Sequence, residues 1–340
     1  MTVRRFVGGH IKEIVTIGII VLIFLACIIA RPEMFDESRI PSIVNSILFW
    51  MPLNLTVAMG MMMVVIVRDI DLSVGSSVAL SAMIAGIMFR DLGSPLWLGA
   101  IAAIVVGALC GAFNGFLVAY LNIPAIIVTL GTMNAYRGLT YIISAGKQVT
   151  NYELPDMNYL VTQGVSAGEF LAPWIVIIAF LITAAFSFLM RYSHFGREIY
   201  AVGSNREAAH LRGINCKKTE FLIFLIIGVL CGITAIMSAA RFGYVNPSNT
   251  GNGLEFVVIS ATIIGGVSVS GGSGTVLGVF LGCLLLGTVN NMITVMAIPG
   301  TVQRFSYGMI IVLSLLIDWM VRAVQTRQRI RELERKEAVS

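Results

Sequence analysis

The polar side chains best placed to contact a partner are concentrated in one segment, residues 191–220, which separates two long apolar runs. The segment holds six Lys/Arg and three Glu, and it contains Glu207-Ala208-Ala209 followed by Gly213. Hydrophobic segments on both sides place this polar segment in water at one membrane face, and its excess of Lys/Arg places it on the cytoplasmic side. This pattern predicts a docking helix that another protein moves, and not a reaction centre.

The sequence contains few residues that could perform catalysis. The three histidines, His10, His194 and His210, include no pair at metal-binding helical spacing, and no G-x-S-x-G nucleophile motif occurs. Gly146-Lys147 lacks the upstream glycine and the following Ser/Thr of a nucleotide-binding loop. We therefore expect no enzymatic activity, no metal and no cofactor, and any ATP that drives this chain binds to another polypeptide.

Two short segments interrupt apolar sequence and free backbone groups that lipid cannot satisfy. The first break is residues 68–76, RDIDLSVGS, and the second break is residues 265–274, GGVSVSGGSG. Aligned without gaps, LSVGSSVAL and VSGGSGTVL are consistent with an internal duplication. They share Ser73 with Ser270, Gly75 with Gly272, Ser76 with Ser273, and Leu80 with Leu277.

The two breaks allow two interpretations. Paired interruptions in two halves are typical of a solute path near the middle of the membrane. Alternatively, Asp71 or Ser73, and Ser273, are N-caps of helices that begin at the membrane surface, and the glycines permit a tight turn. The residues that would line a path here are Asp71, Ser73, Gly75, Gly271, Gly272 and Ser273.

Several other polar residues lie inside apolar runs, where they normally face a helix bundle or a cavity. Interhelical hydrogen bonds are the expected role for the asparagines, and contact with a solute is the alternative. The further path candidates are Asn54, Asn134 and Asn290. The remaining polar residues in these runs are Asn45, Asn114, Arg137, Glu255 and Asn291.

Composition identifies an integral membrane protein, because 57% of residues are apolar, 12% are charged and the mean hydropathy is +0.89. The net charge of +5 comes largely from three clusters: the N-terminal thirteen residues, the segment 191–220 and the tail after Arg322. No basic face with interleaved aromatics remains, so nucleic acid is not an expected partner. The five cysteines form no C-x-x-C pair, and four of them lie in apolar runs.

A membrane core of roughly 30 Å needs about 20 helical residues. This length predicts an all-α, polytopic helical bundle with about ten transmembrane helices and the two glycine/serine-rich breaks. With the basic N-terminus inside, ten crossings place the segment 191–220 and a charged tail, 323–340, in the cytoplasm. The predicted spans are 14–30, 43–67, 72–89, 96–120, 124–144, 173–190, 221–241, 254–267, 274–297 and 302–322.

Four motifs in one order carry a family resemblance. They are IDLSVGS at 70–76, NGFLVAYLNIPAIIVTLGTMNAYRGL at 114–139, FGREIYAVGSNREAAHLRGI at 195–214, and GGVSVSGGSGTVLG at 265–278. Together they resemble the permease subunits of bacterial ATP-binding-cassette importers of the ribose, xylose, rhamnose and autoinducer-2 group. The resemblance covers nearly the whole chain and implies a single permease domain over residues 1–340 in the bacterial inner membrane.

The resemblance also implies partners. A cytoplasmic ATPase pair would grip the inner face, an extracytoplasmic binding protein would deliver a sugar, and a second permease copy or a related permease would complete the pathway. The short helix from Asn205 to Gly213 resembles the coupling helix, with Ala208 and Ala209 small enough to enter an ATPase cleft. In this resemblance Glu207 supports the helix start through the dipole, and Gly213 supplies the C-terminal stop. The residues carried over to this role are Asn205, Arg206, Glu207, Ala208, Ala209 and Gly213.

The chain departs from the common pattern in two places. Arg68-Asp69 stands where a Gly-Gly pair frequently precedes the Ile-Asp-Leu-Ser motif, and no apolar-Pro element follows Gly213. Two other functions stay open. One is a permease for branched-chain amino acids, and the other is a proton-coupled secondary carrier that uses Asp69, Asp71 or Glu255.

Overall fold

The computed structural model describes residues 11–36, 39–150, 159–167 and 170–299, together with five positions between 302 and 312. The tenth predicted span and the charged tail therefore lie almost wholly outside the described residues. The described helices are α2 (Ile11–Ala30), η1 (Pro32–Phe35), α3 (Ile40–Ile66), α4 (Val74–Leu92), α5 (Leu96–Ala119), α6 (Ala125–Ser144), α7 (Tyr159–Thr162), α8 (Trp174–Tyr192), α9 (His194–Ser204), α10 (Arg206–Leu211), α11 (Cys216–Phe242), α12 (Leu254–Ile264) and α13 (Val276–Val295).

The helices match the predicted spans. Seven helices in the described part are long and apolar enough to cross a membrane: α2, α3, α4, α5, α8, α11 and α13. Two further helices coincide with predicted spans, since α6 (Ala125–Ser144) lies in the span 124–144 and the short α12 begins at the start of 254–267. The prediction of a polytopic helical membrane protein is confirmed.

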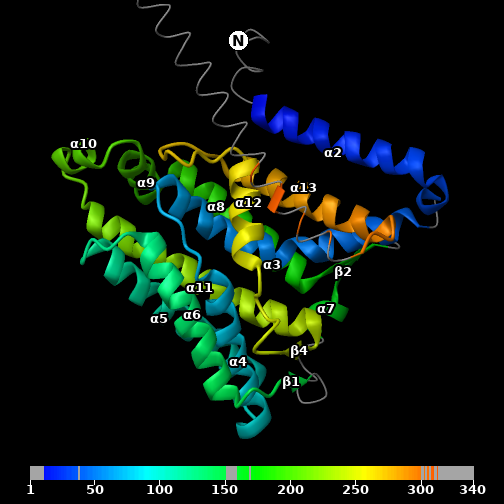
Figure 1. Cartoon of the computed structure of the whole chain (residues 1–340), viewed down its shortest axis with the longest axis horizontal. Coiled ribbons are helices and arrows are strands. Elements are labelled where there is room, and N and C mark those ends of the chain that lie inside the picture. Colours follow the sequence, from blue (N-terminus) through cyan, green and yellow to red (C-terminus); the bar gives the residue numbers. More distant parts are fainter. Residues whose placement is uncertain are drawn as a thin grey trace, which may run out of the picture.

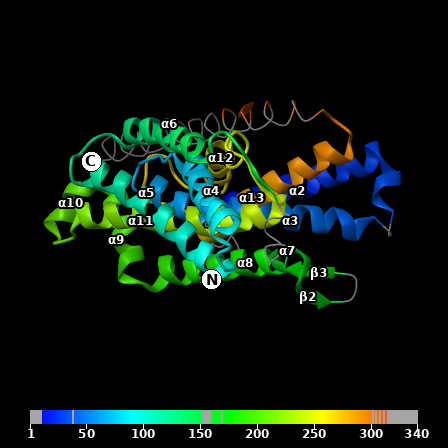
Figure 2. The ribbon, with the colours of Figure 1, turned by 90° about the horizontal axis from the view of Figure 1, so that it is seen from below.

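The connections between helices contain two small antiparallel sheets. Strand β1 (Val149–Thr150) pairs with β4 (Tyr244–Val245), and β2 (Gly164–Ala167) pairs with β3 (Phe170–Pro173). Helix α11 runs from the neighbourhood of α10 to that of β4 (Figure 1). We call the two ends of this helix the α10 end and the β4 end. Figure 2 shows α6 and α8 on opposite sides of the bundle.

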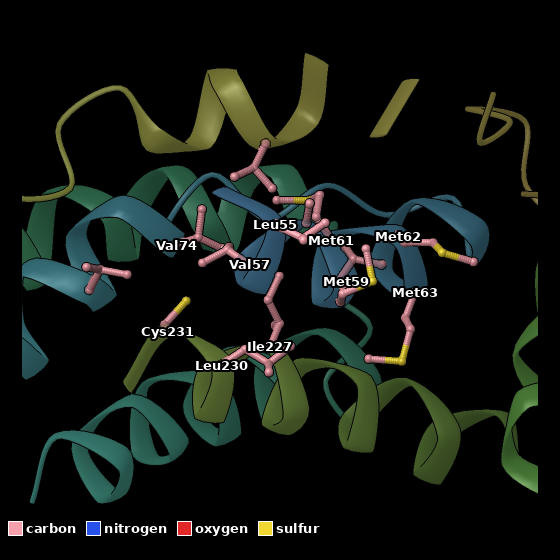
Figure 3. Close-up of a cluster of buried hydrophobic side chains, with 14 of the residues drawn as sticks. Leu55, Val57, Met59, Met61, Met62, Met63, Val74, Ile227, Leu230 and Cys231 are labelled. Atoms are coloured by element: carbon pink, nitrogen blue, oxygen red, sulfur yellow. The ribbon is translucent and has the colours of Figure 1, made fainter. Parts of the chain in front are cut away.

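Helix α3 forms the centre of the core. Its second half is buried without interruption from Met51 to Ile66, and it contacts α11, α13, α8 and α12. The side chains of Met59 and Met61–Met63 are fully buried, and Figure 3 shows them with Ile227 and Leu230 of α11. Unbranched methionines fill irregular gaps between helices, so the burial of these four side chains indicates a packing role.

The closest helix pair is α5 with α11. Glycines recur every four residues on α5 at 107, 111 and 115, and on α11 at 228 and 232. A Cβ atom at Gly111 would collide with the carbonyl oxygen of Phe224, and one at Gly228 would collide with that of Gly107. Small residues at this spacing let two helix backbones touch. The two helices are therefore held as one unit.

The boundary of α11 differs from the prediction. The helix begins at Cys216 and not at 221, because the Oδ1 atom of Asn215 accepts a hydrogen bond from the Lys218 amide at 3.1 Å and caps a polar first turn. Hydropathy alone assigned these polar residues to a loop.

Candidate functional site

The segment 191–220 forms the last two residues of α8, then α9, α10 and the start of α11. The Asn205 Oδ1 atom accepts a hydrogen bond from the Ala208 amide at 3.0 Å and caps α10, whose first turn carries Glu207. Gly213 has φ +84°, and its amide donates to the His210 carbonyl at 2.9 Å. Glycine adopts this left-handed conformation without strain, so it closes the helix as expected.

Helix α10 turns most of its surface outward. Ala209 is only 3% exposed, whereas Leu211 is 87% exposed. Glu207, Ala208 and His210 are also exposed. Ala209 thus packs against the bundle, and the remaining face combines an acidic group, a small side chain and an apolar one. Such a face is available to a protein partner.

Both breaks meet the segment 191–220 at one place, the C-terminal end of α9. The Gly272 amide donates to the Ile66 carbonyl at 2.9 Å, which joins the second break to the end of α3. A Cβ at Gly203 would collide with the Ile66 carbonyl oxygen and come within 2.8 Å of the Gly272 nitrogen. The Tyr200 hydroxyl donates to the Gly274 carbonyl at 2.8 Å. The end of α9 is therefore a joint between α3 and the segment that precedes α13.

Arg68 completes this joint. Its Nε donates to the Gly203 carbonyl at 2.9 Å, and its Nη2 donates to the Ser204 carbonyl at 2.7 Å. These two acceptors lie in the last turn of α9, where a cation is favoured. Arg68 itself has φ +73°, a conformation that normally selects glycine. The position at which a Gly-Gly pair is frequent thus keeps a glycine-like backbone but adds a side chain that reaches α9.

The interior of the first break is a buried hydrogen-bond network. The Asp71 Oδ1 atom accepts from the Ser73 amide at 2.8 Å and from the Ser73 hydroxyl at 2.7 Å. The Asn114 Nδ2 atom donates to the Ser73 hydroxyl at 2.8 Å, and the Tyr136 hydroxyl lies 3.2 Å from the Asn114 Oδ1. Gly75 follows and packs directly against the Gly251 carbonyl and the Glu255 carboxylate. Three helices, α4, α5 and α6, are joined by these polar groups.

Capping explains the two breaks only in part. Ser73 occupies the N-cap position of α4, but its side chain makes no cap hydrogen bond and binds Asp71 instead. Ser273 is not a cap: Thr275 is the N-cap of α13, and its Oγ1 accepts from the Gly278 amide at 3.0 Å. The N-cap interpretation is therefore wrong for Ser273 and incomplete for Ser73.

A cavity of about 310 Å³ lies beside α10, between the first break, the α5–α6 connection and the start of α11. In its wall, the Arg206 Nη2 atom forms an ion pair with the Glu220 Oε2 at 2.9 Å. Asp69 lines the same cavity. Burial raises the pKa of Asp69 to about 6, and the charge of Arg206 opposes the shift.

None of the remaining path candidates, Asn54, Asn134 and Asn290, lines this cavity. Asn54 is buried, yet its Nδ2 donates to the Trp50 carbonyl of its own helix at 2.9 Å. Asn134 is exposed on α6 and donates to the Leu130 carbonyl at 2.9 Å, so the expectation that it faces the interior is wrong for the single chain. Asn290 lies half-buried on α13. The expected interhelical hydrogen bond is found at Asn114.

The residues that join α9, α10 and the two breaks were not evident from the sequence. Gly203, Tyr136 and Glu220 received no role, and Arg68 was noted only as a departure from a pattern. The repeated glycine spacing on α5 and α11 was a readable signal for their contact, whereas no local pattern reveals the partners of Gly203 or Glu220. Within the described residues, no group of three His, Cys, Asp or Glu side chains is placed to hold a metal ion.

Comparison with known proteins fits this geometry. Residues 43–315 match the family described as "Branched-chain amino acid transport system / permease component". The chain belongs to this family. It is 36% identical over 272 residues to the autoinducer 2 import system permease protein LsrC of Enterobacter sp. (strain 638), an alignment that covers 80% of this chain and 77% of the relative. No solved structure matches it.

Two further relatives carry the same description. The LsrC protein of Klebsiella pneumoniae is 34% identical over 318 residues, which cover 94% of this chain and 89% of the relative. The LsrC protein of Escherichia coli (strain K12 / DH10B) is 34% identical over 272 residues, covering 79% of this chain and 77% of the relative. The protein is therefore a multi-pass membrane permease of a transport system.

Proposed function

We propose that this chain is the translocation subunit of an ATP-binding-cassette importer for a monosaccharide or a similar polyol-like solute, autoinducer 2 among them. A separate ATPase in the cytoplasm binds α10, and an extracytoplasmic binding protein delivers the solute to the opposite face. A second copy or a related permease completes the pathway in the bacterial inner membrane. The observation that carries this proposal is the joint at the end of α9, to which α10 is directly attached.

The joint explains how one small helix can act on the whole bundle. Gly203 contacts the Ile66 carbonyl of α3 and the Gly272 amide that precedes α13. A movement of α10 is therefore transmitted through the end of α9 to both breaks at once. Nucleotide binding can shift the conformation of the bundle only if the ATPase contacts this chain differently in its two nucleotide states. We assign this contact to α10.

The buried network in the first break suits a neutral, hydroxyl-rich solute. Asp71 and Ser73 satisfy one another in the closed bundle, and Gly75 keeps the backbone of α4 close to Glu255. Opening this contact would offer hydroxyl, amide and backbone groups near the middle of the bundle. A sugar needs a wet and weakly binding passage and no fixed charge partner of its own.

The first experiment tests whether ATP hydrolysis by a separate ATPase or a proton gradient drives uptake. The purified chain, reconstituted alone in vesicles, is expected to accumulate neither autoinducer 2, nor D-ribose, nor L-leucine. With its cognate ATPase, binding protein and ATP, vesicles are expected to accumulate autoinducer 2 or D-ribose. Accumulation by the chain alone under a proton gradient would establish a secondary carrier instead, and uptake of L-leucine alone would establish an amino-acid permease.

The second experiment tests α10 as the contact with the ATPase. Gly213→Pro removes the positive φ and the amide that donates to His210, and Glu207→Lys reverses a charge at the helix start. Both variants are expected to insert normally but to separate ATP hydrolysis from uptake. Gly93→Pro is the matched control, because Gly93 ends α4 with φ +58° and its amide is also hydrogen-bonded, to the Met88 carbonyl. Normal uptake by both α10 variants would refute the assignment.

A further inference from the structure

The ion pair between Arg206 and Glu220 is the direct charged link between α10 and the membrane-spanning helices. Arg206 is the first residue of α10, and its side chain is half exposed. Glu220 belongs to the first turns of α11, and its side chain is only 4% exposed. A buried carboxylate that keeps one exposed partner depends strongly on that partner, because removing it leaves an uncompensated charge.

Glu220 connects Arg206 to more than one helix. Helix α11 touches α5 backbone to backbone through Gly107, Gly111 and Gly228. Packed backbones of this kind cannot slide apart gradually, so α5 and α11 respond to a force as one body. In the described conformation, Arg206 thus attaches α10 to the α5–α11 unit.

A second carboxylate, that of Asp69, lines the same cavity from a different element. Asp69 belongs to the first break, lies beside Arg68, and lines the cavity together with Arg206 and Glu220. Among the described residues, none hydrogen-bonds to the Asp69 carboxylate, while Arg68 is engaged by the carbonyls of Gly203 and Ser204. The positive charge of Arg206 acts on both carboxylates. One cation is therefore shared by two acids on two different elements.

We propose that Arg206 exchanges its partner during the transport cycle, pairing with Glu220 in the described conformation and with Asp69 when α10 is displaced. The exchange moves the attachment of α10 from the α5–α11 unit to the break between α3 and α4. Arg206, Glu220 and Asp69 are positioning residues in this scheme, and none contacts the solute. The inference depends on the proposed function, because it takes α10 as the part moved by the ATPase.

The first test uses the full importer in vesicles, with autoinducer 2 as the solute and ATP hydrolysis recorded in parallel. Asp69→Asn is expected to assemble and hydrolyse ATP but to lose about tenfold in uptake, within the usual range of a coupling effect. Asp91→Asn is the matched control, because Asp91 is an exposed acid at the far end of α4 that pairs with Arg90. Equal uptake by Asp69→Asn and Asp91→Asn would overturn the exchange.

The second test separates an exchange from a fixed ion pair. The double variant Arg206→Glu/Glu220→Arg restores the observed pair with reversed charges, so thermal stability is expected to recover relative to Arg206→Glu alone. Uptake is expected to stay low, because the carboxylate at position 206 now repels Asp69. Adding Asp69→Lys inverts all three charges and is expected to recover uptake. Full recovery by the double variant would show a fixed pair and refute the exchange.

The experiments distinguish an error in the proposed role of α10 from an error in the partner exchange of Arg206. If α10 is not the contact with the ATPase, Gly213→Pro and Glu207→Lys transport normally. If only the exchange is wrong, those variants lose uptake while Asp69→Asn keeps it.

Discussion

At the scale of single residues, Arg68 combines a local cost with a long-range contact. A non-glycine residue at φ +73° is disfavoured by about 1 kcal/mol. Its two hydrogen bonds to the last carbonyls of α9 offset that cost, since charge-assisted bonds are stronger than neutral ones. A glycine pair at this position would leave the turn loose, whereas Arg68 ties the turn to α9.

Asn114 is expected to stabilise the junction of α4, α5 and α6. Its amide bridges Ser73 and Tyr136 in a buried site. Asn114→Ala removes both hydrogen bonds and leaves buried polar groups with fewer partners, so we expect the free energy of unfolding to fall by about 2 kcal/mol. Asn134→Ala is the control, because Asn134 is exposed and bonds only within its own helix. Thermal unfolding in detergent measures both, and equal midpoints would contradict the network.

Asp69 gives a pH-dependent prediction. The pKa of its carboxyl is about 6 in the folded protein, against an ordinary value of 3.8, because burial disfavours the charged form. The folded protein therefore binds this proton more tightly than the unfolded chain does. The resulting stabilisation is complete below pH 3.8 and is lost as the pH rises through 6.

The measurement compares wild type with Asp69→Asn. The midpoint of thermal unfolding is recorded at pH 5 and at pH 7.5, and the variant is expected to gain stability relative to wild type at the higher pH. A constant difference between the two proteins across this range would show that Asp69 is not buried as described.

Among the helices, the close packing of α5 on α11 predicts that a larger side chain at the contact lowers the free energy of unfolding. Gly111→Val places a branched side chain against the Phe224 carbonyl, and neither helix backbone can yield without separating the pair. We expect a loss of about 3 kcal/mol, the upper part of the range for overpacking. Gly18→Val is the control, because a Cβ at Gly18 meets nothing within 4 Å. Thermal unfolding of the two variants decides, and similar midpoints would refute the close contact.

The sequence predicted the elements more completely than their contacts. Apolar runs located α2–α6, α8 and α11–α13, because lipid imposes both length and composition on a spanning segment, whereas α7 and α9 were not predicted. Boundaries moved where polar residues begin a helix, as at Cys216, since an asparagine cap and not hydropathy sets that start. The short helix α10 was expected from Glu207-Ala208-Ala209 and Gly213, whereas its N-cap, Asn205, is seen only in the structure.

The contacts of the candidate site were beyond local patterns. Gly203 and Gly272 lie far apart in sequence, and each is an ordinary glycine until α3 is placed between them. The same holds for Glu220, whose charge was counted only as part of a polar segment. Asn134 shows the opposite error: residence in an apolar run does not reveal which face of the helix a side chain occupies.

At the scale of the whole molecule, the orientation in the membrane follows from charge. The α10 end carries the six Lys/Arg of residues 191–220, and the N-terminal thirteen residues and the tail after Arg322 add two further basic clusters. Basic connections remain on the cytoplasmic side. The last turn of α4, by contrast, lies far from α10 (Figure 1) and presents Leu92, which is 72% exposed. We therefore expect α10 inside the cell and the end of α4 outside.

Cysteine labelling tests this orientation in intact cells. The five native cysteines are first replaced, and Lys217→Cys or Leu92→Cys then provides one exposed thiol at each end. A membrane-impermeant maleimide is expected to modify Leu92→Cys in intact cells and Lys217→Cys only after permeabilisation. The reverse pattern would place α10 outside, beyond the reach of any cytoplasmic ATPase. The ATPase can act on the joint at the end of α9 only if it can reach α10 from the cytoplasm. That result would therefore refute both the orientation and the proposed coupling.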